Sequence, residues 1–270
     1  MNFSVLMSVY DKENAIFFSE AIESITNQSL KANEIILVID GTINEKLQTV
    51  VSKYTLQFKE LKVVELNINV GLGKALNRGL LECSNEIVIR MDTDDICSPR
   101  RFEKLINIFV EHPNFDVVGS WIEEFNNEPG DYKKVRRVKK YSSEINNQCK
   151  NRSPMNHPAV AFKKTSVINA GGYKHFPLLE DYYLWFRMIK EGYIFYNIQE
   201  SLMYLRVGND MVGRRWGWNY LLNEYRLFKI MYDDKFISLF GFMKNLAIRL
   251  PLRTFPKPLL KFFYKYFLRI

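Results

Sequence analysis

Ile35-Ile36-Leu37-Val38-Ile39-Asp40-Gly41 is a run of five apolar residues that ends in an acidic residue and a glycine. The hydrophobicity is continuous and does not alternate, as it would in a strand with one face in water. A run of this kind is typical of a parallel β-strand covered by helices on both faces. The stretch therefore predicts a buried strand of an α/β sheet, followed by a turn.

Four other apolar runs, enriched in β-branched residues, lie on either side of this one. They are at Phe3–Val9, Val63–Leu66, Ile87–Met91 and Val117–Ile122. Segments with helical periodicity separate most of them, at about Ala15–Gln28, Asn44–Phe58, Gly73–Cys83 and Pro99–Glu111. The last helix is expected to have Ser98 as its cap and Pro99 at its first position. This alternation predicts an α/β protein with a mostly parallel central sheet flanked by helices.

The second half of the chain has a less regular pattern. Residues 126–152 are polar and charged, and we expect a mobile loop or a hairpin there. An apolar run at Ala159–Phe162 and an amphipathic helix near Asp181–Gly192 follow. Because no clean linker divides the body, we expect one domain at residues 1–230, with halves at about 1–105 and 106–230. Residues 231–270 then form a C-terminal segment.

Composition excludes several classes of protein. A hydrophobic fraction of 47% is enough to build a core, so intrinsic disorder is excluded as the main state. Three cysteines without paired spacing indicate a reducing, cytosolic compartment. The chain starts without a basic leader, and charged residues interrupt its longest apolar run, so neither a signal peptide nor a spanning helix is expected.

The net charge of +8 comes from residues 235–270, which hold eight basic residues and no acidic ones. Lys261, Lys265 and Arg269 recur every four residues among leucines and aromatic side chains, which places them in one stripe of a helix. Such a helix is typical of a membrane surface. The neutral body offers no broad basic face, so nucleic acid is not an expected partner. Packing on the body or in a dimer interface is the alternative, and the oligomeric state stays open.

Polar residues follow four of the predicted strands at the point where each strand ends. They are Tyr10-Asp11, Asp40-Gly41, Asn69-Val70-Gly71 and Asp92-Thr93-Asp94-Asp95. Ligands of open α/β sheets bind at the carboxyl ends of the strands, so we expect a binding site at this edge. Tyr10-Asp11 or Asp40-Gly41 taken alone is more typical of an ordinary turn that ends a strand.

The turn at Asp92–Asp95 carries the strongest chemical signal. Its three carboxylates repel one another unless a positive group joins them. Oxygen ligands of this kind suit Mg²⁺ or Mn²⁺, which commonly bind one or two carboxylates together with substrate phosphates. The turn therefore predicts a divalent metal site, with a solvated acidic turn as the alternative.

With these motifs in place, the sequence resembles the family 2 glycosyltransferases, enzymes with the GT-A (Rossmann-like) fold that move a sugar from a nucleotide diphosphate to a hydroxyl. The resemblance covers about residues 3–230. It rests on several short motifs whose order and spacing together are specific. They are Ser4-Val5-Leu6-Met7-Ser8-Val9-Tyr10, Asn27-Gln28-Ser29, Val38-Ile39-Asp40-Gly41, Asn69-Val70-Gly71-Leu72, Asn77-Arg78-Gly79, the Asp92–Asp95 turn, Gly171-Gly172-Tyr173 and Glu180-Asp181.

The resemblance implies a nucleotide-sugar site in the first half of the chain. Asp40 is expected to hydrogen-bond the uracil ring, and Tyr10 is expected near the base. Asn69 and Gly71 belong to the same site. Arg78 is expected either to meet the nucleotide or the acidic turn, or to form a surface salt bridge.

The resemblance also implies roles within the acidic turn. Asp92 or Asp94 is expected to contact the ribose, and Asp94 with Asp95 is expected to bind the Mn²⁺ or Mg²⁺ that bridges the diphosphate. Some relatives supply a late histidine to the metal, but residues 204–210 contain none. The metal then relies on the Asp92–Asp95 turn and water alone, or Asp210 is a further ligand. Alternatively, three arginines are candidates to clamp the diphosphate. These are Arg206, Arg214 and Arg215.

On the acceptor side, Glu180 and Asp181 begin a predicted helix, where acidic residues are also common as plain helix-capping groups. By resemblance Asp181 is the general base that takes the proton of the acceptor hydroxyl, with Glu180 beside it. His157 and Trp185 are expected on the acceptor side of the site. Attack from the face opposite the nucleotide implies inversion of the sugar's configuration.

These expectations combine into one function. We expect an inverting transfer of a hexose from a UDP-sugar to a hydroxyl of a lipid-linked glycan, in bacterial surface polysaccharide synthesis. The protein is then cytoplasmic and peripheral on the inner face of the cell membrane. A sugar-nucleotide nucleotidyltransferase is one alternative, although no glycine-rich loop follows the first strand. A non-catalytic membrane-bound adaptor that keeps the fold is the other.

Overall fold

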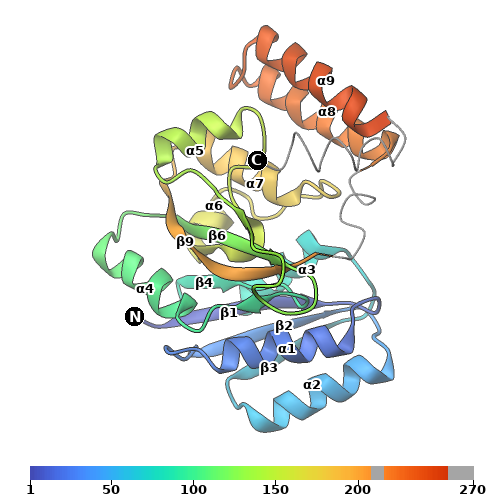
Figure 1. Cartoon of the computed structure of the whole chain (residues 1–270), viewed down its shortest axis with the longest axis vertical. Coiled ribbons are helices and arrows are strands. Elements are labelled where there is room, and N and C mark those ends of the chain that lie inside the picture. The colour runs from blue at the N-terminus through green and yellow to red at the C-terminus, as the bar shows by residue number, and fades with distance from the viewer. Residues whose placement is uncertain (208–215, 255–270) are drawn as a thin grey trace.

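The computed structural model, which describes residues 1–207 and 216–254, is built around one mixed sheet (Figure 1). Its strands are β1 (Phe3–Val9), β2 (Glu34–Asp40), β3 (Leu61–Leu66), β4 (Ile87–Arg90), β5 (Ile96–Cys97), β6 (Val117–Phe125), β7 (Lys134–Arg136), β8 (Ala161–Lys163) and β9 (Phe195–Arg206). The order across the sheet is β3-β2-β1-β4-β8-β6-β9-β5, with β7 paired to β6. Strands β1 to β4 run parallel, so their carboxyl ends meet at one edge.

Helices cover both faces of this sheet (Figure 1). On one face are α1 (Ala15–Thr26), α2 (Glu45–Gln57) and α4 (Arg101–Glu111). On the other are α3 (Leu72–Glu82), α5 (Ser142–Cys149), α6 (Lys164–Asn169) and α7 (Glu180–Lys190). The remaining helices are α8 (Trp218–Asp233), α9 (Leu239–Thr254) and a 3-10 turn, η1 (His157–Ala159). The predicted α/β architecture is confirmed.

Strand β2 explains why the sheet is covered on both sides. All seven of its residues are buried, and successive side chains enter the two cores on opposite faces. Helix α3 lies close against it because Gly79 has no side chain. A Cβ at that position would lie 2.5 Å from Leu6 Cδ1 and from Val38 Cγ2. The glycine of the Asn77-Arg78-Gly79 motif therefore serves helix–sheet packing.

The predicted start of α4 is wrong. The helix begins at Arg101, not at Pro99, and Ser98 does not cap it. Ser98 and Pro99 instead form a turn whose carbonyl groups accept hydrogen bonds from the Gln28 side chain (2.7 Å) and the Ser29 N–H (2.9 Å). These long-range bonds favour the turn over an additional helical turn.

The prediction of a loop or hairpin at residues 126–152 is only partly right. Strand β7 does form a hairpin with β6, but the segment also contains α5. Ile145 and Cys149 lie four residues apart on α5, and both are buried in the core. Two apolar anchors among polar residues were too few to give a clear helical pattern in the sequence.

The C-terminal helices α8 and α9 form a hairpin that packs on the body, at the end of the molecule far from α2 (Figure 1). Phe228 and Phe236 contact Tyr182 and Phe186 of α7, with ring centroids 6.2 and 5.1 Å apart. The expected domain boundary after residue 230 falls inside α8. Side chains of α8, among them Phe228 and Met231, belong to the core of the body. Lys261, Lys265 and Arg269 lie outside the described residues.

Within residues 1–207 and 216–254, no helix combines the length and apolarity that crossing a bilayer requires.

Candidate active site

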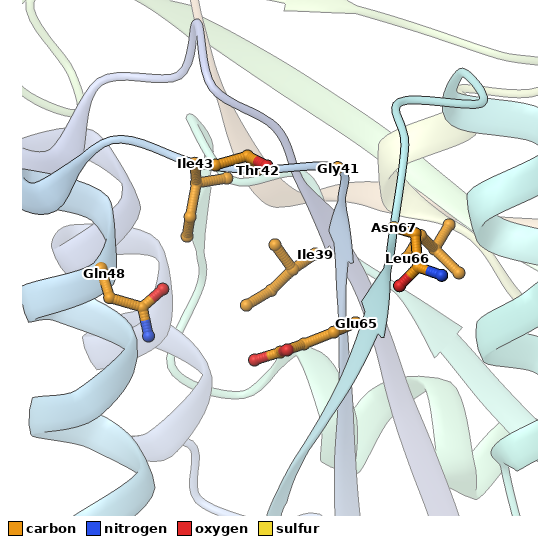
Figure 2. A pocket seen from close by; sticks show the side chains of 8 residues that line it. All are labelled: Ile39, Gly41, Thr42, Ile43, Gln48, Glu65, Leu66 and Asn67. Atoms are coloured by element: carbon orange, nitrogen blue, oxygen red, sulfur yellow. The ribbon is translucent and has the colours of Figure 1, made fainter.

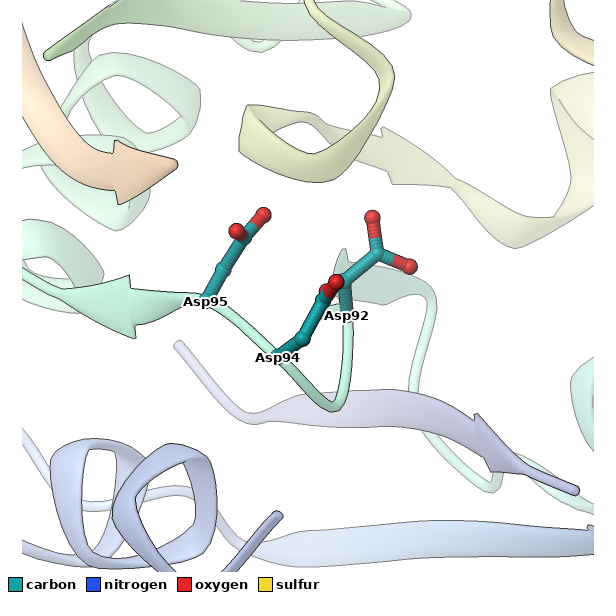
Figure 3. A group of neighbouring side chains, drawn as sticks. All are labelled: Asp92, Asp94 and Asp95. Carbon is teal, nitrogen blue, oxygen red and sulfur yellow. The ribbon is translucent and has the colours of Figure 1, made fainter. Parts of the chain in front are cut away.

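The acidic turn lies where β4 ends, next to the carboxyl end of β1. Asp92, Asp94 and Asp95 bring carboxylate oxygens within 4.8 Å of one another (Figure 3). The turn leads directly into β5, which pairs with β9, so it is fixed on both sides by the sheet. The structure thus brings the three carboxylates of the sequence motif together in one fixed turn.

Asp95 is the most constrained of the three. It is fully buried, and its Oδ1 accepts the backbone N–H of Arg206 (2.9 Å). Its Oδ2 has no hydrogen-bond partner among the residues that the structure describes. Burial, followed by the charges of Asp94 and Asp92, raises the pKa of Asp95 well above its usual range.

This donor set fits a divalent cation. The three residues offer oxygen ligands only, which are the ligands that Mg²⁺ and Mn²⁺ prefer. A cation at the turn would satisfy the unpartnered Asp95 oxygen and offset the repulsion between the carboxylates. The candidate ligand Asp210 lies outside the described residues, as do Arg214 and Arg215.

Arg206 holds this turn from the end of β9. Its backbone binds Asp95, its Nε donates to the Asp94 carbonyl (3.1 Å), and its guanidinium also pairs with Glu20. Phe17 and Phe125 lie on the guanidinium, with centroids 3.9 and 4.4 Å from Arg206 Cζ. Because these contacts occupy the guanidinium, the geometry favours a positioning role and not the expected clamp on a diphosphate.

A second arginine, Arg90, holds the Asp92 carboxylate in place. Arg90 is buried at the end of β4 and forms an ion pair with the Asp92 carboxylate. Its Nε and Nη1 have no hydrogen-bond partner in the described part of the chain. A buried cation beside the acidic turn lowers the electrostatic cost of gathering three carboxylates there.

Asp40 organises the neighbouring loop. Its two carboxylate oxygens accept the backbone N–H groups of Val70 (2.7 Å) and Gly71 (3.0 Å), and its carbonyl accepts Asn69 Nδ2 (3.1 Å). Asp40 is buried, so the geometry favours a role in holding the loop over the expected contact with a base. Gly41 has a φ of +83°, and a Cβ there would lie 2.6 Å from the Asn69 nitrogen.

A cavity of about 350 Å³ opens beside the carboxyl ends of β2 and β3 (Figure 2). Gln48 of α2 and Glu65 of β3 face it, and Gly41 and Thr42 form part of its rim. Tyr10 is exposed in the turn after β1. Arg78, by contrast, forms an exposed ion pair with Glu82 one helical turn away (2.7 Å). This is the surface salt bridge that was the alternative expected from the sequence for this residue.

Helix α7 presents the two acidic residues of the second half in its first turn. Asp181 is partly exposed, and its Oδ2 accepts a hydrogen bond from Ser153 (3.2 Å). Burial, with a smaller contribution from the charge of Asp181, raises the pKa of the Glu180 carboxyl. Both carboxylates are partly exposed, and Asp181 is the one that Ser153 orients.

Tyr173 joins the two halves of the site. Its backbone N–H and carbonyl are both bound by the side chain of Asn77 on α3, at 2.8 and 2.6 Å. Burial is the main cause of the raised pKa of Tyr173, and the charges of Asp181 and Asp92 add to it. Both carboxylates therefore lie within electrostatic reach of one buried hydroxyl.

His157 lies next to Tyr173, and Trp185 packs against His157. His157 Nε2 is 3.0 Å from the Tyr173 hydroxyl, and its ring meets the Trp185 edge at a centroid distance of 6.1 Å. Desolvation, then the charge of Arg90, lowers the pKa of His157, so the ring is neutral at pH 7. Trp185 is fully buried, so it supports His157 and is not itself exposed to an acceptor.

Sequence reasoning missed Arg90, Asn77 and Tyr173 as individual contributors, and β9 as a strand. A charged residue inside the apolar run Ile87–Met91 was a usable signal for Arg90, because an unpaired charge is costly in a buried strand. Asn77 and Tyr173 stood in quoted motifs, but their mutual bonds span 96 residues and have no local signature.

Comparison with known proteins identifies the family. The model of glycosyl transferase family 2 matches residues 4–171. The chain is 38% identical to the amylovoran biosynthesis glycosyltransferase AmsE of Erwinia amylovora, over 97% of this chain and 98% of that one. It is 36% identical to the UDP-Gal:alpha-D-GlcNAc-diphosphoundecaprenol beta-1,3-galactosyltransferase of Escherichia coli, over 99% and 96%.

Solved structures agree in fold. TarS of S. aureus, residues 1–349 in complex with UDP-GlcNAc, matches with a TM-score of 0.68 at 18% identity, over 93% of this chain and 72% of that one. The mannosyltransferase PcManGT of Pyrobaculum calidifontis, in complex with GDP-Man and Mn²⁺, matches with a TM-score of 0.65 at 16% identity, over 93% and 69%. These likenesses confirm the GT-A fold. With the family model covering more than half of the chain, the protein belongs to glycosyl transferase family 2.

Proposed function

We propose that the protein transfers a hexose from a UDP-sugar to a hydroxyl of a lipid-linked glycan, with inversion, during synthesis of a bacterial surface polysaccharide. The observation that carries this proposal is the arrangement of the Asp92–Asp95 turn and Asp181 around Tyr173. One part of this site suits a metal-bound diphosphate, and the other offers a carboxylate to an acceptor.

The donor half would act by binding and orientation. Asp94 and Asp95 would hold Mg²⁺ or Mn²⁺, with Asp92 near the ribose, and Arg206 and Arg90 keep the turn in place. A bound cation would stabilise the negative charge that develops on the leaving nucleoside diphosphate. Asp40 would keep the loop with Asn69 and Gly71 in the shape that receives the nucleotide.

The acceptor half would supply the base. Asp181 Oδ2 would take the proton of the acceptor hydroxyl while that oxygen attacks the anomeric carbon, and UDP would leave from the opposite face. The hydrogen bond from Ser153 orients this carboxylate. Glu180, with its raised pKa, is less suited to serve as the charged base.

The relatives favour this donor and acceptor. AmsE is named for amylovoran biosynthesis, and the Escherichia coli relative is named for transfer of galactose to a GlcNAc-diphospholipid. Both align over nearly their whole length. Neither a nucleotidyltransferase nor a non-catalytic adaptor is favoured by the comparisons. A lipid-linked acceptor implies that the transfer takes place at the inner face of the cell membrane.

The first test is calorimetric titration of UDP with and without Mn²⁺. We expect binding that requires the metal, because three carboxylates without a cation would repel the diphosphate. Binding of equal affinity in both conditions would contradict the metal role. No binding at all by demonstrably folded protein would contradict the nucleotide site itself.

The second test is Asp181→Asn, assayed with a UDP-hexose and a GlcNAc-diphospholipid. We expect the transfer rate to fall by about 10²–10⁴-fold, as for loss of a general base, with UDP affinity unchanged. Asp234→Asn is the matched control, because Asp234 is a partly exposed carboxylate that pairs with Lys190. A normal rate in the Asp181→Asn enzyme would remove this residue from the mechanism.

A further inference from the structure

Helix α9 exposes an apolar surface. Five large apolar side chains on its outward side are 43–79% exposed, where a surface helix normally carries polar residues. They are Leu239, Phe240, Met243, Ile248 and Leu250. We refer to these five residues as the α9 face.

The inward side of the same helix carries buried polar side chains. Asn245 and Arg253 are buried, and Arg253 Nε pairs with Glu224 of α8 at 2.8 Å. Asn245 donates to the Lys150 carbonyl after α5 (2.8 Å). The helix is therefore attached to the body by these polar contacts and by the ring of Phe242, which packs on Tyr225 and Tyr232 of α8, while the α9 face points outward. The five side chains of the α9 face can be shielded from water only by contact with a surface outside the described residues.

The charge around this face is one-sided. Lys244 is exposed between its apolar residues, and residues 235–270 hold eight basic residues and no acidic ones. Two of these basic residues, Arg249 and Arg253, pair with Glu224 of α8, whereas Lys244 is exposed. Exposed apolar side chains with a lysine among them complement a surface that is apolar within and anionic outside. An anionic lipid bilayer has this chemistry.

We propose that the α9 face docks the protein on an anionic lipid bilayer, with the helix lying in the plane of the headgroups. No described helix is suited to cross the membrane, so contact is limited to its surface. Phe240 and Met243 enter the headgroup–acyl boundary, while Lys244 reaches the lipid phosphates.

The hairpin links this surface to the acceptor side of the site. Asn223 of α8 donates to the Pro177 carbonyl (3.1 Å), in the loop just before Asp181. Phe228 of α8 packs on Tyr182, the residue after Asp181. Docking through α9 thus holds the start of α7 at a defined place relative to the bilayer. In this respect the inference rests on the proposed function, since a lipid-linked acceptor lies in that bilayer.

The test is flotation of the full chain with vesicles of phosphatidylcholine alone or mixed with phosphatidylglycerol. The variant Phe240→Ser/Met243→Ser/Ile248→Ser should lower the partition coefficient for anionic vesicles by at least tenfold. Lys244→Gln should lower it about fivefold, and high salt should remove that difference. Leu56→Ser/Leu81→Ser is the matched control, because these residues are also exposed but lie on α2 and α3.

The outcomes separate this inference from its alternatives. Equal vesicle binding by the wild type and the triple variant would overturn it, with residues 255–270 then carrying the membrane contact. A wild-type dimer that becomes a monomer in the variant, without vesicle binding by either, would assign the face to a second copy. UDP titration of each variant should match the wild type. Vesicle binding through α9 by a protein that binds no UDP would uphold the docking surface and refute the proposed function.

Discussion

Asp40→Asn tests whether this residue acts by holding a loop or by contacting the base. In the structure both carboxylate oxygens accept backbone N–H groups, from Val70 at 2.7 Å and from Gly71 at 3.0 Å. Asparagine is nearly the same size but has only one oxygen on its side chain. Its amide group must therefore point an N–H donor at one of two backbone donors.

The cost follows from the lost bond. A hydrogen bond to a charged group contributes about 1.5–3 kcal/mol, and the variant loses one such bond and weakens the other. Asp40 is buried, but Gly71 is exposed and water can replace part of the loss. We therefore expect the free energy of unfolding to fall by about 2 kcal/mol.

The assay is urea denaturation without nucleotide, followed by UDP titration with Mn²⁺. A positioning role predicts lower stability in the absence of any ligand, together with weaker UDP binding because the loop is no longer held. Asp11→Asn is the control, since Asp11 is an exposed strand-end carboxylate. Its effect on stability should stay within about 0.5 kcal/mol.

One result would refute the reasoning. If Asp40→Asn weakened UDP binding while its unfolding free energy stayed within about 0.5 kcal/mol of the wild type, the carboxylate would serve the nucleotide directly. The expectation from sequence, a hydrogen bond to uracil, would then be correct.

Three other predictions follow from single contacts. Arg206→Lys keeps the charge but loses the guanidinium group that joins the Asp94 carbonyl to Glu20. Mn²⁺-dependent UDP affinity should therefore fall about tenfold. An unchanged affinity across a Mn²⁺ titration would contradict this role. Burial alone would raise the pKa of Glu34, but hydrogen bonds, the largest from Ser4, lower it to about 2. The wild type should therefore exceed Glu34→Gln in stability by about 3 kcal/mol above pH 4.5, and lose that advantage as the pH falls toward 2 in denaturation curves. Gly79→Ala should cost about 1–3 kcal/mol in thermal unfolding, because its Cβ meets the sheet, and a wild-type melting temperature would show that α3 can shift.

Local sequence patterns were enough for much of the fold. The continuous run at Ile35–Ile39 predicted β2 because burial on both faces requires an apolar residue at every position. The acidic turn was also visible in the sequence, since carboxylates this close together occur in one short segment. Patterns of this kind depend on neighbours within a few residues, so no knowledge of the rest of the chain is needed.

Other elements had weak local signals. Helix α5 has two buried anchors in a polar segment, and the start of α4 depends on bonds from Gln28 and Ser29 far away in the sequence. Strand β9 joins the sheet beside β6 with irregular register, so its inward residues do not alternate cleanly. Propensity alone favoured other structures at these positions, and tertiary contacts outweighed it.

The sequence by itself determined the α/β class, the acidic metal-type turn and the family to which the chain belongs. Only the tertiary structure decided which residues hold that turn, that Asp40 binds a loop, and that the five apolar residues of the α9 face are exposed. Arg206 lies 111 residues from Asp95, and Asn77 lies 96 from Tyr173. Hydrogen bonds over such separations leave no periodic trace in the chain, because their geometry is set by how the sheet brings distant strands together.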